Sequence, residues 1–288
     1  MNDIKKQFNP KELDIRSKYH LMISGISPRP IAFVTSICKN NNVNLAPYSF
    51  FNGFGANPPI VGFSPALSGR TGLPKDTLLN IKETEEFTIS IADSKMVGQV
   101  SLSSCEFDKN TDEYEMTGLT KQKSKLVKSP YVKESPFAME CKLYDIIELG
   151  NKAASGNLIL GEIVMFHISE NILDEKNSVD PYKLDAISRL GGSWYSKSKA
   201  GLFEYNKPKH NGIGFNSLPK NILKSKLITA NELSQLASIE KIPMINHNLI
   251  NENQNKSISE LENLFKKLIE KRKFNDAWSI ASIINKIL

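Results

Sequence analysis

The fold is decided by SPRPIAFVTS (residues 27–36), NLAPYSFFNG (44–53), NPPIVGFS (57–64) and PKDTLLNI (74–81). The first three stretches are apolar or β-branched runs bounded by Pro, Gly and Asn, a pattern typical of short β-strands. Ser, Thr, Asn, Arg and Lys lie around them, without an acid–base pair. Such hydroxyl, amide and cationic groups are typical of a site for a phosphorylated cofactor, which then supplies the chemistry.

Working outward, apolar side chains alternate with polar ones in several further runs, which predicts half-buried strands. The run 158–168 is apolar on both faces, as expected of a barrel strand that is packed inside and covered outside. Glu140 and Lys142 are expected to lie on the face of their strand opposite the apolar side chains. The expected strands are 30–36, 43–46, 59–64, 87–91, 137–143 and 158–168. We therefore predict a mainly β fold with helices, in which antiparallel strands close or nearly close into a barrel.

The sequence changes in kind after about Tyr205. Residues 229–232 (Thr-Ala-Asn-Glu) and 257–260 (Ser-Ile-Ser-Glu) are capping boxes, which mark helix starts. Apolar side chains then recur at helical spacing between residues 261 and 287. Because such stripes are more often packing surfaces than binding sites, we predict a helical C-terminal extension over residues 206–288.

Length and composition are those of an ordinary globular protein, with 288 residues, 24% charged and 40% hydrophobic. No run of about 18 apolar residues is present, and the N-terminus lacks the apolar core of a signal peptide. We therefore expect a cytoplasmic protein without a membrane partner. The net charge is +6, but the densest lysine cluster, at residues 121–128, has no interleaved aromatic side chains. Nucleic-acid binding is therefore not expected.

The cysteines and histidines indicate neither a disulfide framework nor a metal site. Cys38, Cys105 and Cys141 are odd in number and far apart, so we interpret them as reduced, space-filling thiols. The four histidines form no metal-binding pattern. The pairs Gly53-Phe-Gly55 and Gly212-Ile-Gly214 lack the third glycine of a dinucleotide-binding turn, which argues against a Rossmann fold.

The fourth stretch carries groups that suit a phosphate ester. A phosphate monoester bears close to two negative charges and attracts a cation together with hydroxyl and amide donors. Asp76 or Thr77 is expected to cap a helix over residues 77–81, whose N-terminal amides would favour an anion. Taken alone, this motif is most simply the start of a surface helix. The residues that can supply the cation and the hydroxyls are Lys75, Thr77, Ser49 and Arg29.

Several short motifs follow one another along the chain: Arg29-Pro-Ile-Ala, Asn44 to Asn52, Asn57-Pro-Pro, Lys75-Asp-Thr, Asn80-Ile, Glu140-Cys-Lys-Leu, Gly156 to Glu162 and Arg189 to Tyr195. In this order and spacing they resemble the flavin reductase-like family of FMN-binding split barrels. The resemblance spans about residues 12–205 and implies an FMN-binding split β-barrel domain there. It also implies a homodimer with FMN at the subunit interface and, in many members, hydride transfer from NAD(P)H to flavin. No catalytic side chain is implied, because the flavin itself accepts the hydride.

The flavin ring is flat, apolar on its faces and polar along one edge, so its pocket needs small residues and side-chain donors. Residues 46–53 meet that description, and Tyr48 could either wall the ring or fill the core. Arg189 could neutralise the ring or a nicotinamide phosphate, or pair with a carboxylate across a dimer. The candidate cofactor-binding residues are Arg29, Thr35, Ser36, Ala46, Pro47, Tyr48, Ser49, Asn52, Ser64, Lys75, Asp76, Thr77 and Arg189.

Two alternatives to a reductase remain open from the sequence. A flavin carrier or storage protein would need the same phosphate pocket but would not have to admit a nicotinamide. A barrel of the same kind could also hold another ligand, such as a deazaflavin or pyridoxal phosphate. Both alternatives keep the predicted fold and differ only in chemistry.

Overall fold

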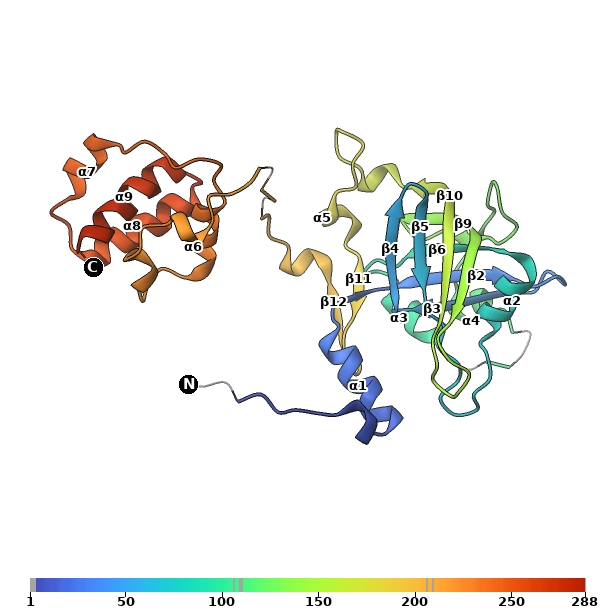
Figure 1. The fold of residues 1–288 in the computed structure, drawn as a ribbon. Coiled ribbons are helices and arrows are strands. Elements are labelled where there is room, and N and C mark those ends of the chain that lie inside the picture. The colour runs from blue at the N-terminus through green and yellow to red at the C-terminus, as the bar shows by residue number, and fades with distance from the viewer. Residues whose placement is uncertain (1–3, 106, 109–110, 206, 209, 288) are drawn as a thin grey trace. The chain divides into compact units, whose positions relative to one another are not determined.

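The computed structural model describes residues 4–105, 107–108, 111–205, 207–208 and 210–287 (Figure 1). The chain divides into two compact units, Met1–Phe203 and Glu204–Leu288. In the part of the chain that is described, no helix is both long and apolar enough to cross a membrane.

The first unit is built on a seven-stranded antiparallel sheet with the order β3-β2-β6-β9-β10-β5-β4. The predicted strands at residues 30–36 and 43–46 pair as an antiparallel hairpin, with Ala32 opposite Tyr48. This sheet contains the antiparallel strands that the sequence predicts. Its strands are β2 (Ala32–Ile37), β3 (Val43–Tyr48), β4 (Phe51–Ala56), β5 (Pro59–Phe63), β6 (Glu86–Ile91), β9 (Phe137–Glu148) and β10 (Asn157–Ile168).

Two apolar clusters lie on the two faces of β2, all of whose residues are buried. Val34 belongs to the cluster that contains Phe63 and Phe87, whereas its neighbour Phe33 packs with Tyr114. This division follows from the two-residue period of a strand, which sends successive side chains to opposite faces. β2 is thus a central strand covered on both faces.

The long strands β9 and β10 carry the curvature of the sheet. Their pairing shifts register between Leu160 and Gly161 and again between Ile163 and Met165, and such irregularities bend a strand. Gly161 lies against the ring of Phe87, so that an added Cβ would be 2.4 Å from the ring carbon Cζ. A side chain at this position would displace the buried ring, so the packing requires glycine here.

Shorter elements surround the sheet, and α2 starts at the stretch singled out in the sequence. Lys75, rather than Asp76 or Thr77, occupies the N-cap of α2, and its side chain makes no capping hydrogen bond. The expected cap is therefore wrong by one or two residues. These elements are α1 (Ile15–Gly25), α2 (Asp76–Thr84), α3 (Val97–Leu102), α4 (Glu113–Thr117), α5 (Pro181–Leu184), β1 (Arg29–Pro30), β7 (Lys121–Gln122), β8 (Tyr131–Val132), β11 (Ile187–Arg189) and β12 (Tyr195–Lys197).

Glu140 is fully buried, contrary to the expectation that it lies on the polar face of its strand. Its carboxylate accepts hydrogen bonds from the backbone N–H groups of Lys125, Leu126 and Val127, at 2.6–3.0 Å. It also lies 2.6 Å from Nε2 of His167 on β10. The buried charge therefore anchors the polar loop before β8 to the sheet, and alternation along β9 alone could not reveal that loop.

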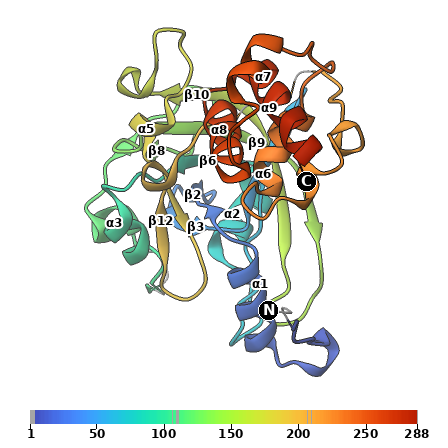
Figure 2. The ribbon, with the colours of Figure 1, turned by 90° about the vertical axis from the view of Figure 1, so that its left-hand side faces the viewer.

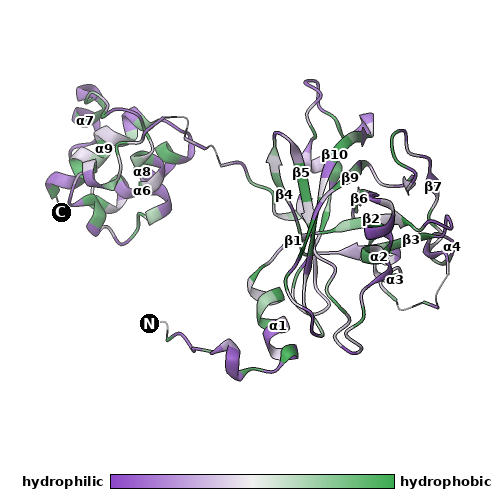
Figure 3. Cartoon of the chain, turned by 45° about the vertical axis from the view of Figure 1, so that its right-hand side comes forward, coloured by the Kyte–Doolittle hydropathy of each residue, from purple (hydrophilic) through white to green (hydrophobic). Residues whose placement is uncertain are grey.

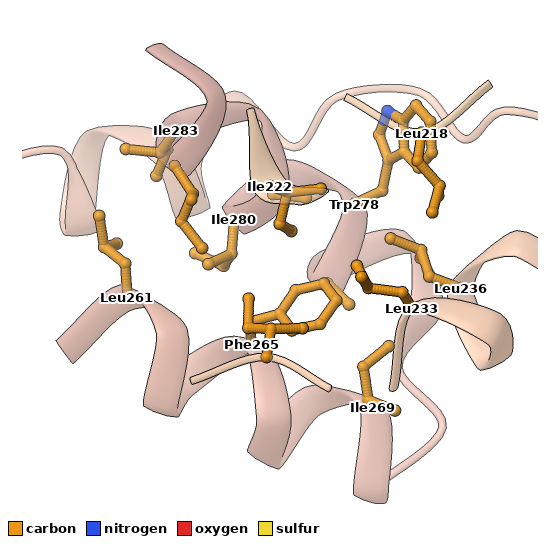
Figure 4. Packing of buried hydrophobic residues seen from close by; sticks show 14 of the residues in the cluster. Leu218, Ile222, Leu233, Leu236, Leu261, Phe265, Ile269, Trp278, Ile280 and Ile283 are labelled. Atoms are coloured by element: carbon orange, nitrogen blue, oxygen red, sulfur yellow. The ribbon is translucent and has the colours of Figure 1, made fainter. Parts of the chain in front are cut away.

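The second unit has a separate apolar core formed by its own helices. Both predicted capping boxes are present, at Thr229 with Glu232 and at Ser257 with Glu260. Phe265 lies in the middle of the buried cluster (Figure 4). In Figure 3, hydrophobic (green) and hydrophilic (purple) residues occur on the same helices, as is typical of amphipathic helices. Helix α8 packs along α9 (Figure 2). The helices are α6 (Ala230–Ala237), α7 (His247–Asn253), α8 (Ile258–Glu270) and α9 (Phe274–Ile287).

Candidate functional site

A groove runs along β3 and across the N-terminus of α2. Its centre is a hollow of about 330 Å³, and a second hollow of about 340 Å³ adjoins it. We call the second hollow the serine end. A third hollow of about 110 Å³, the acidic end, adjoins the other side of the centre. The residues shared by the centre and the serine end are Pro47, Tyr48, Ser68, Arg70 and Lys75; those shared by the centre and the acidic end are Asn44, Asp76, Phe107 and Glu113.

Most of the candidate residues meet in this groove. Three separate stretches of the sequence supply them, and local contacts bring these stretches together. The amide of Ser64 donates to the carbonyl of Phe50 at 2.9 Å, and the hydroxyl of Tyr48 on β3 donates to Thr77 on α2 at 2.8 Å. Ser49 and Ser64 line the serine end, and Lys75 lies where it joins the centre. The candidates that line the groove are Ala46, Pro47, Tyr48, Ser49, Ser64, Lys75, Asp76 and Thr77.

Thr77 ties the start of α2 to β3. Its hydroxyl oxygen accepts hydrogen bonds from Nδ2 of Asn44 and from the hydroxyl of Tyr48, both at 2.8 Å. Burial raises the pKa of Tyr48 well above its ordinary value, and the bond to Thr77 only partly offsets this. Tyr48 therefore remains a neutral donor at physiological pH, and the first turn of α2 is held at a fixed place beside β3.

The centre of the groove combines cations with helix amides. The amides of Asp76 and Thr77, at the first two positions of α2, have no partner within the helix and carry the positive end of its dipole, whereas the amides of Leu78 and Leu79 donate to the carbonyl of Lys75. Lys75 at the N-cap and Arg70 in the preceding loop line the same hollow, together with Ser68 and Thr71. Two cations, hydroxyls and helix amides around one hollow are the donor set that binds a phosphate ester.

The loop between β5 and α2 contributes residues that were not among the candidates. Ser68, Arg70 and Thr71 line the centre, and the Ser68 hydroxyl accepts a bond from the Thr71 amide at 3.2 Å. A Gly-Arg-Thr-Gly turn next to a phosphate motif was the signal available in the sequence. Cys105, interpreted as a space-filling thiol, is exposed and also lines the centre.

Arg29 lies outside the groove and is buried, with 5% of its surface exposed. Its guanidinium donates to the carbonyls of Ile23 and Ile26 at the end of α1, and to the carbonyl of Leu190. It also donates to the hydroxyl of Ser49 at 3.3 Å. Arg29 is thus placed to position Ser49 rather than to reach the centre of the groove.

Thr35 and Ser36 are also separate from the groove. Both are fully buried on β2, where the Thr35 hydroxyl lies 2.7 Å from the hydroxyl of Tyr114. Ser36 accepts a hydrogen bond from Nδ2 of Asn80 at 3.2 Å. Both hydroxyls were candidates for binding the cofactor, but their partners, Tyr114 and Asn80, belong to the helices α4 and α2.

Asn52 and Arg189 do not line the groove formed by the described residues of one chain. Asn52 lies exposed on β4, and its side-chain oxygen accepts from the amide of Gly53. The Arg189 guanidinium donates to the carbonyl of Trp194 at 3.2 Å and lies over the ring of Tyr195. Within one chain, Arg189 therefore closes the turn between β11 and β12.

Comparison with known proteins agrees with this geometry. Residues 24–183 match the flavin reductase like domain. The structure resembles nitrilotriacetate monooxygenase component B from Bacillus cereus, with 34% identity and a TM-score of 0.65 over 71% of this chain and 99% of that one. The 2-nitrobenzoate 2-nitroreductase from Pseudomonas fluorescens gives 31% identity and a TM-score of 0.64 over 71% and 97%. A split-barrel candidate flavin reductase from Shewanella frigidimarina has 25% identity and a TM-score of 0.61, over 71% of this chain and 99% of that one.

The chain therefore belongs to the flavin reductase-like family, and its first unit has the split-barrel fold. Each of the three proteins is matched almost from end to end. The part of this chain that stays unmatched is about as large as its C-terminal unit.

Proposed function

We propose that this protein binds FMN in the groove and acts as an NAD(P)H-dependent flavin reductase. The observation that carries the proposal is the convergence of Arg70, Lys75 and the first amides of α2 on one hollow beside β3. Membership of the flavin reductase-like family supports it. The similarity to a monooxygenase component and to a nitroreductase supports redox chemistry of this kind.

The residues of the groove fit the chemistry of FMN. The phosphate would bind at the centre to Arg70, Lys75 and the α2 amides, with Ser68 and Thr71 as further donors. The ring would lie toward the serine end, where Pro47, Tyr48 and Phe50 offer apolar surface and Ser49 and Ser64 offer polar groups. Bound FMN supplies a ring that accepts hydride from a stacked nicotinamide, so the protein needs only to bind and orient the two.

We also propose that the working form is a homodimer in which a second copy helps to enclose the FMN. Apolar side chains of α1 support this, because Ile15, Tyr19 and Met22 are each about half exposed, at 50–52%. Tyr19 also lines the serine end. An apolar helix face next to an open ligand site is typical of a surface that a partner covers. Analytical ultracentrifugation with and without FMN measures whether this dimer forms.

An absorbance spectrum of the purified protein tests the proposal directly. Addition of FMN is expected to give a bound flavin spectrum, and NADH or NADPH is then expected to bleach it. Binding without bleaching would favour a flavin carrier over a reductase. If denaturation releases a deazaflavin or pyridoxal phosphate instead of FMN, the cofactor assignment is wrong.

The phosphate site is tested by reversing the charge of Lys75. Lys75→Glu is expected to weaken FMN binding by roughly 2 kcal/mol or more, about 30-fold, because repulsion replaces a charge-assisted bond. Titration of flavin fluorescence measures the dissociation constant. The matched control is Lys142→Glu, the same change at an exposed position on β9, which is expected to leave the constant unchanged. An unchanged constant for Lys75→Glu would remove this residue from the site.

A further inference from the structure

Two serine hydroxyls line the serine end alone, and each accepts a hydrogen bond from the protein. Ser49 accepts from Nε of Arg29 at 3.3 Å, and Ser64 accepts from the amide of Asn157 at 3.1 Å. Guanidinium and amide N–H groups only donate, so neither partner can take the proton of the serine hydroxyl. Both hydroxyls therefore keep a proton that points away from these partners.

Neither proton has an acceptor among the residues that the structure describes. The hydroxyls of Ser49 and Ser64 accept the bonds given above and donate to no carbonyl, carboxylate or side-chain amide of that part of the chain. Both side chains are partly buried, and they line an open hollow of about 340 Å³. A hydroxyl in this state donates to the molecule that occupies the hollow.

The rest of the serine end is rich in donors and poor in acceptors. Arg70 and Lys75 line it as well as the centre, and its described lining residues include no aspartate, glutamate, asparagine or glutamine. Three of its backbone carbonyls, those of Phe50, Leu67 and Ser68, already accept hydrogen bonds from amides. A ligand therefore binds best when it turns lone pairs rather than N–H groups toward this wall, because a buried donor without an acceptor costs affinity.

From this we infer that Ser49 and Ser64 donate hydrogen bonds to the polar edge of the flavin ring, and that Arg29 is the positioning residue for Ser49. The inference rests on the proposed binding of FMN. The polar edge of the oxidised ring carries carbonyl oxygens and imine nitrogens, whose lone pairs complement two hydroxyl donors on one wall. Ser49 is thereby assigned to the ring and not to the phosphate, although the sequence suggested it for both.

Arg29 acts on the serine end from outside the groove. Its guanidinium is directed by the carbonyls of Ile23 and Leu190, and only 5% of the residue is exposed. It contacts two successive residues of the wall, because it donates to Ser49 and lies 6.0 Å from the ring centroid of Phe50. A hydroxyl that accepts a bond from a cation is polarised and becomes a stronger donor. Arg29 therefore sets the direction of the Ser49 proton and strengthens the bond that it makes.

Riboflavin, which has the ring of FMN without its phosphate, separates the two ends of the groove. Ser49→Ala and Ser64→Ala are each expected to weaken binding of FMN and of riboflavin by the same factor, about three- to tenfold, because one hydrogen bond to the ring is lost. Lys75→Glu is expected to weaken FMN binding far more than riboflavin binding. Quenching of flavin fluorescence measures the dissociation constants. The visible absorption band of bound FMN is expected to shift in both serine variants, because the hydroxyls contact the ring itself.

The role of Arg29 is tested with Ser49 present and absent. Arg29→Lys keeps the buried charge but loses the planar set of donors that reaches the carbonyls and Ser49 together. With Ser49 present, this change is expected to weaken binding of both flavins about threefold and to shift the absorption band toward that of Ser49→Ala. In the Ser49→Ala background it is expected to have no further effect, because the hydroxyl through which it acts is absent. The control is Ser27→Ala, which removes a hydroxyl bonded to the carbonyl of Ser24 at the same end of α1.

The outcomes separate this inference from the proposed function. Failure of the wild-type protein to bind FMN would overturn both. If FMN binds but Ser49→Ala changes neither the dissociation constants nor the absorption band, the assignment of the hydroxyl to the ring is wrong and the FMN site remains. Weaker binding of FMN alone, with riboflavin unaffected, would assign Ser49 to the phosphate instead. An equal effect of Arg29→Lys in both backgrounds would show that Arg29 supports the fold and does not position Ser49.

Discussion

Replacement of Glu140 by alanine is expected to lower the free energy of unfolding of the first unit by about 3–5 kcal/mol. The carboxylate is fully buried and accepts hydrogen bonds from three successive loop amides, besides its contact with His167. Its removal leaves the buried amide of Val127 and the partly buried amides of Lys125 and Leu126 without this acceptor. A buried donor left in this way costs about 1–3 kcal/mol. Glu140→Gln keeps an acceptor oxygen and is expected to cost less.

Amide hydrogen exchange measures this effect where it occurs. In Glu140→Ala, the amides of residues 125–127 and of β9 are expected to exchange faster than in the wild type. The control is Glu148→Gln, also on β9, which breaks the ion pair between this largely exposed carboxylate and Lys82 on α2. That pair is worth about 0–1 kcal/mol, so β9 should remain protected. Equal exchange in Glu140→Ala and the wild type would show that the buried carboxylate does not stabilise the sheet.

The same carboxylate predicts a dependence of stability on pH. Burial alone would raise the pKa of Glu140, but the bonds from the amides and from His167 outweigh it and hold the pKa below its ordinary value. A carboxyl whose pKa is lower in the folded than in the unfolded chain stabilises the fold above the unfolded value. That contribution is lost as the pH falls from the ordinary pKa of a glutamate through the lower pKa of Glu140 in the folded protein. Glu140→Gln is therefore expected to flatten this acid limb.

Phe265→Ala is expected to lower the free energy of unfolding of the C-terminal unit by about 3–5 kcal/mol. The variant loses the free energy gained by burying the ring, and it leaves a cavity in the core. Phe265 is completely buried on α8 at the centre of the cluster in Figure 4. A domain of this size has a total stability of only about 5–15 kcal/mol, so the variant loses a large part of it.

The two tryptophans of the chain allow this effect to be measured in the intact protein. Trp278 lies in the same core as Phe265, whereas Trp194 belongs to the first unit. In a Trp194→Phe background, the fluorescence of Trp278 reports unfolding of the C-terminal unit alone. Met244→Ala, at a side chain that is 93% exposed, is the matched control and should change stability by less than about 0.5 kcal/mol. A midpoint for Phe265→Ala equal to that of the control would contradict the packing.

Local patterns in the sequence predicted most of the fold. The hairpin of β2 and β3 follows from two β-branched runs and an Asn-rich turn, and both capping boxes mark real helix starts. These features depend on neighbours a few residues away. Burial of Glu140 depends on a loop that precedes it by more than ten residues and returns to its strand. Alternation of polar and apolar residues contains no information about such a contact.

The site was predictable to the extent that its residues lie on regular elements. Ala46 to Ser49 and Lys75 to Thr77 reach the groove because β3 ends and α2 begins beside it. Arg70 was missed because its loop has no periodic pattern. Arg29 and Thr35 lie outside the groove because each has its polar partners elsewhere inside the protein, the carbonyl of Leu190 for Arg29 and the hydroxyl of Tyr114 for Thr35. Only the three-dimensional arrangement distinguishes these cases.

The position of Arg29 limits how far this polypeptide can be trimmed. Its guanidinium donates hydrogen bonds to the carbonyls at the end of α1, to the hydroxyl of Ser49 beside the groove, and to the carbonyl of Leu190 in the turn between β11 and β12. Deletion of the residues before position 27 or after position 189 would remove carbonyl acceptors of the Arg29 guanidinium. The buried cation would then have N–H donors without partners. Shortened forms of the protein should therefore retain Asp14 through Lys197, even though both borders of that segment lie far in sequence from the residues proposed to hold the flavin.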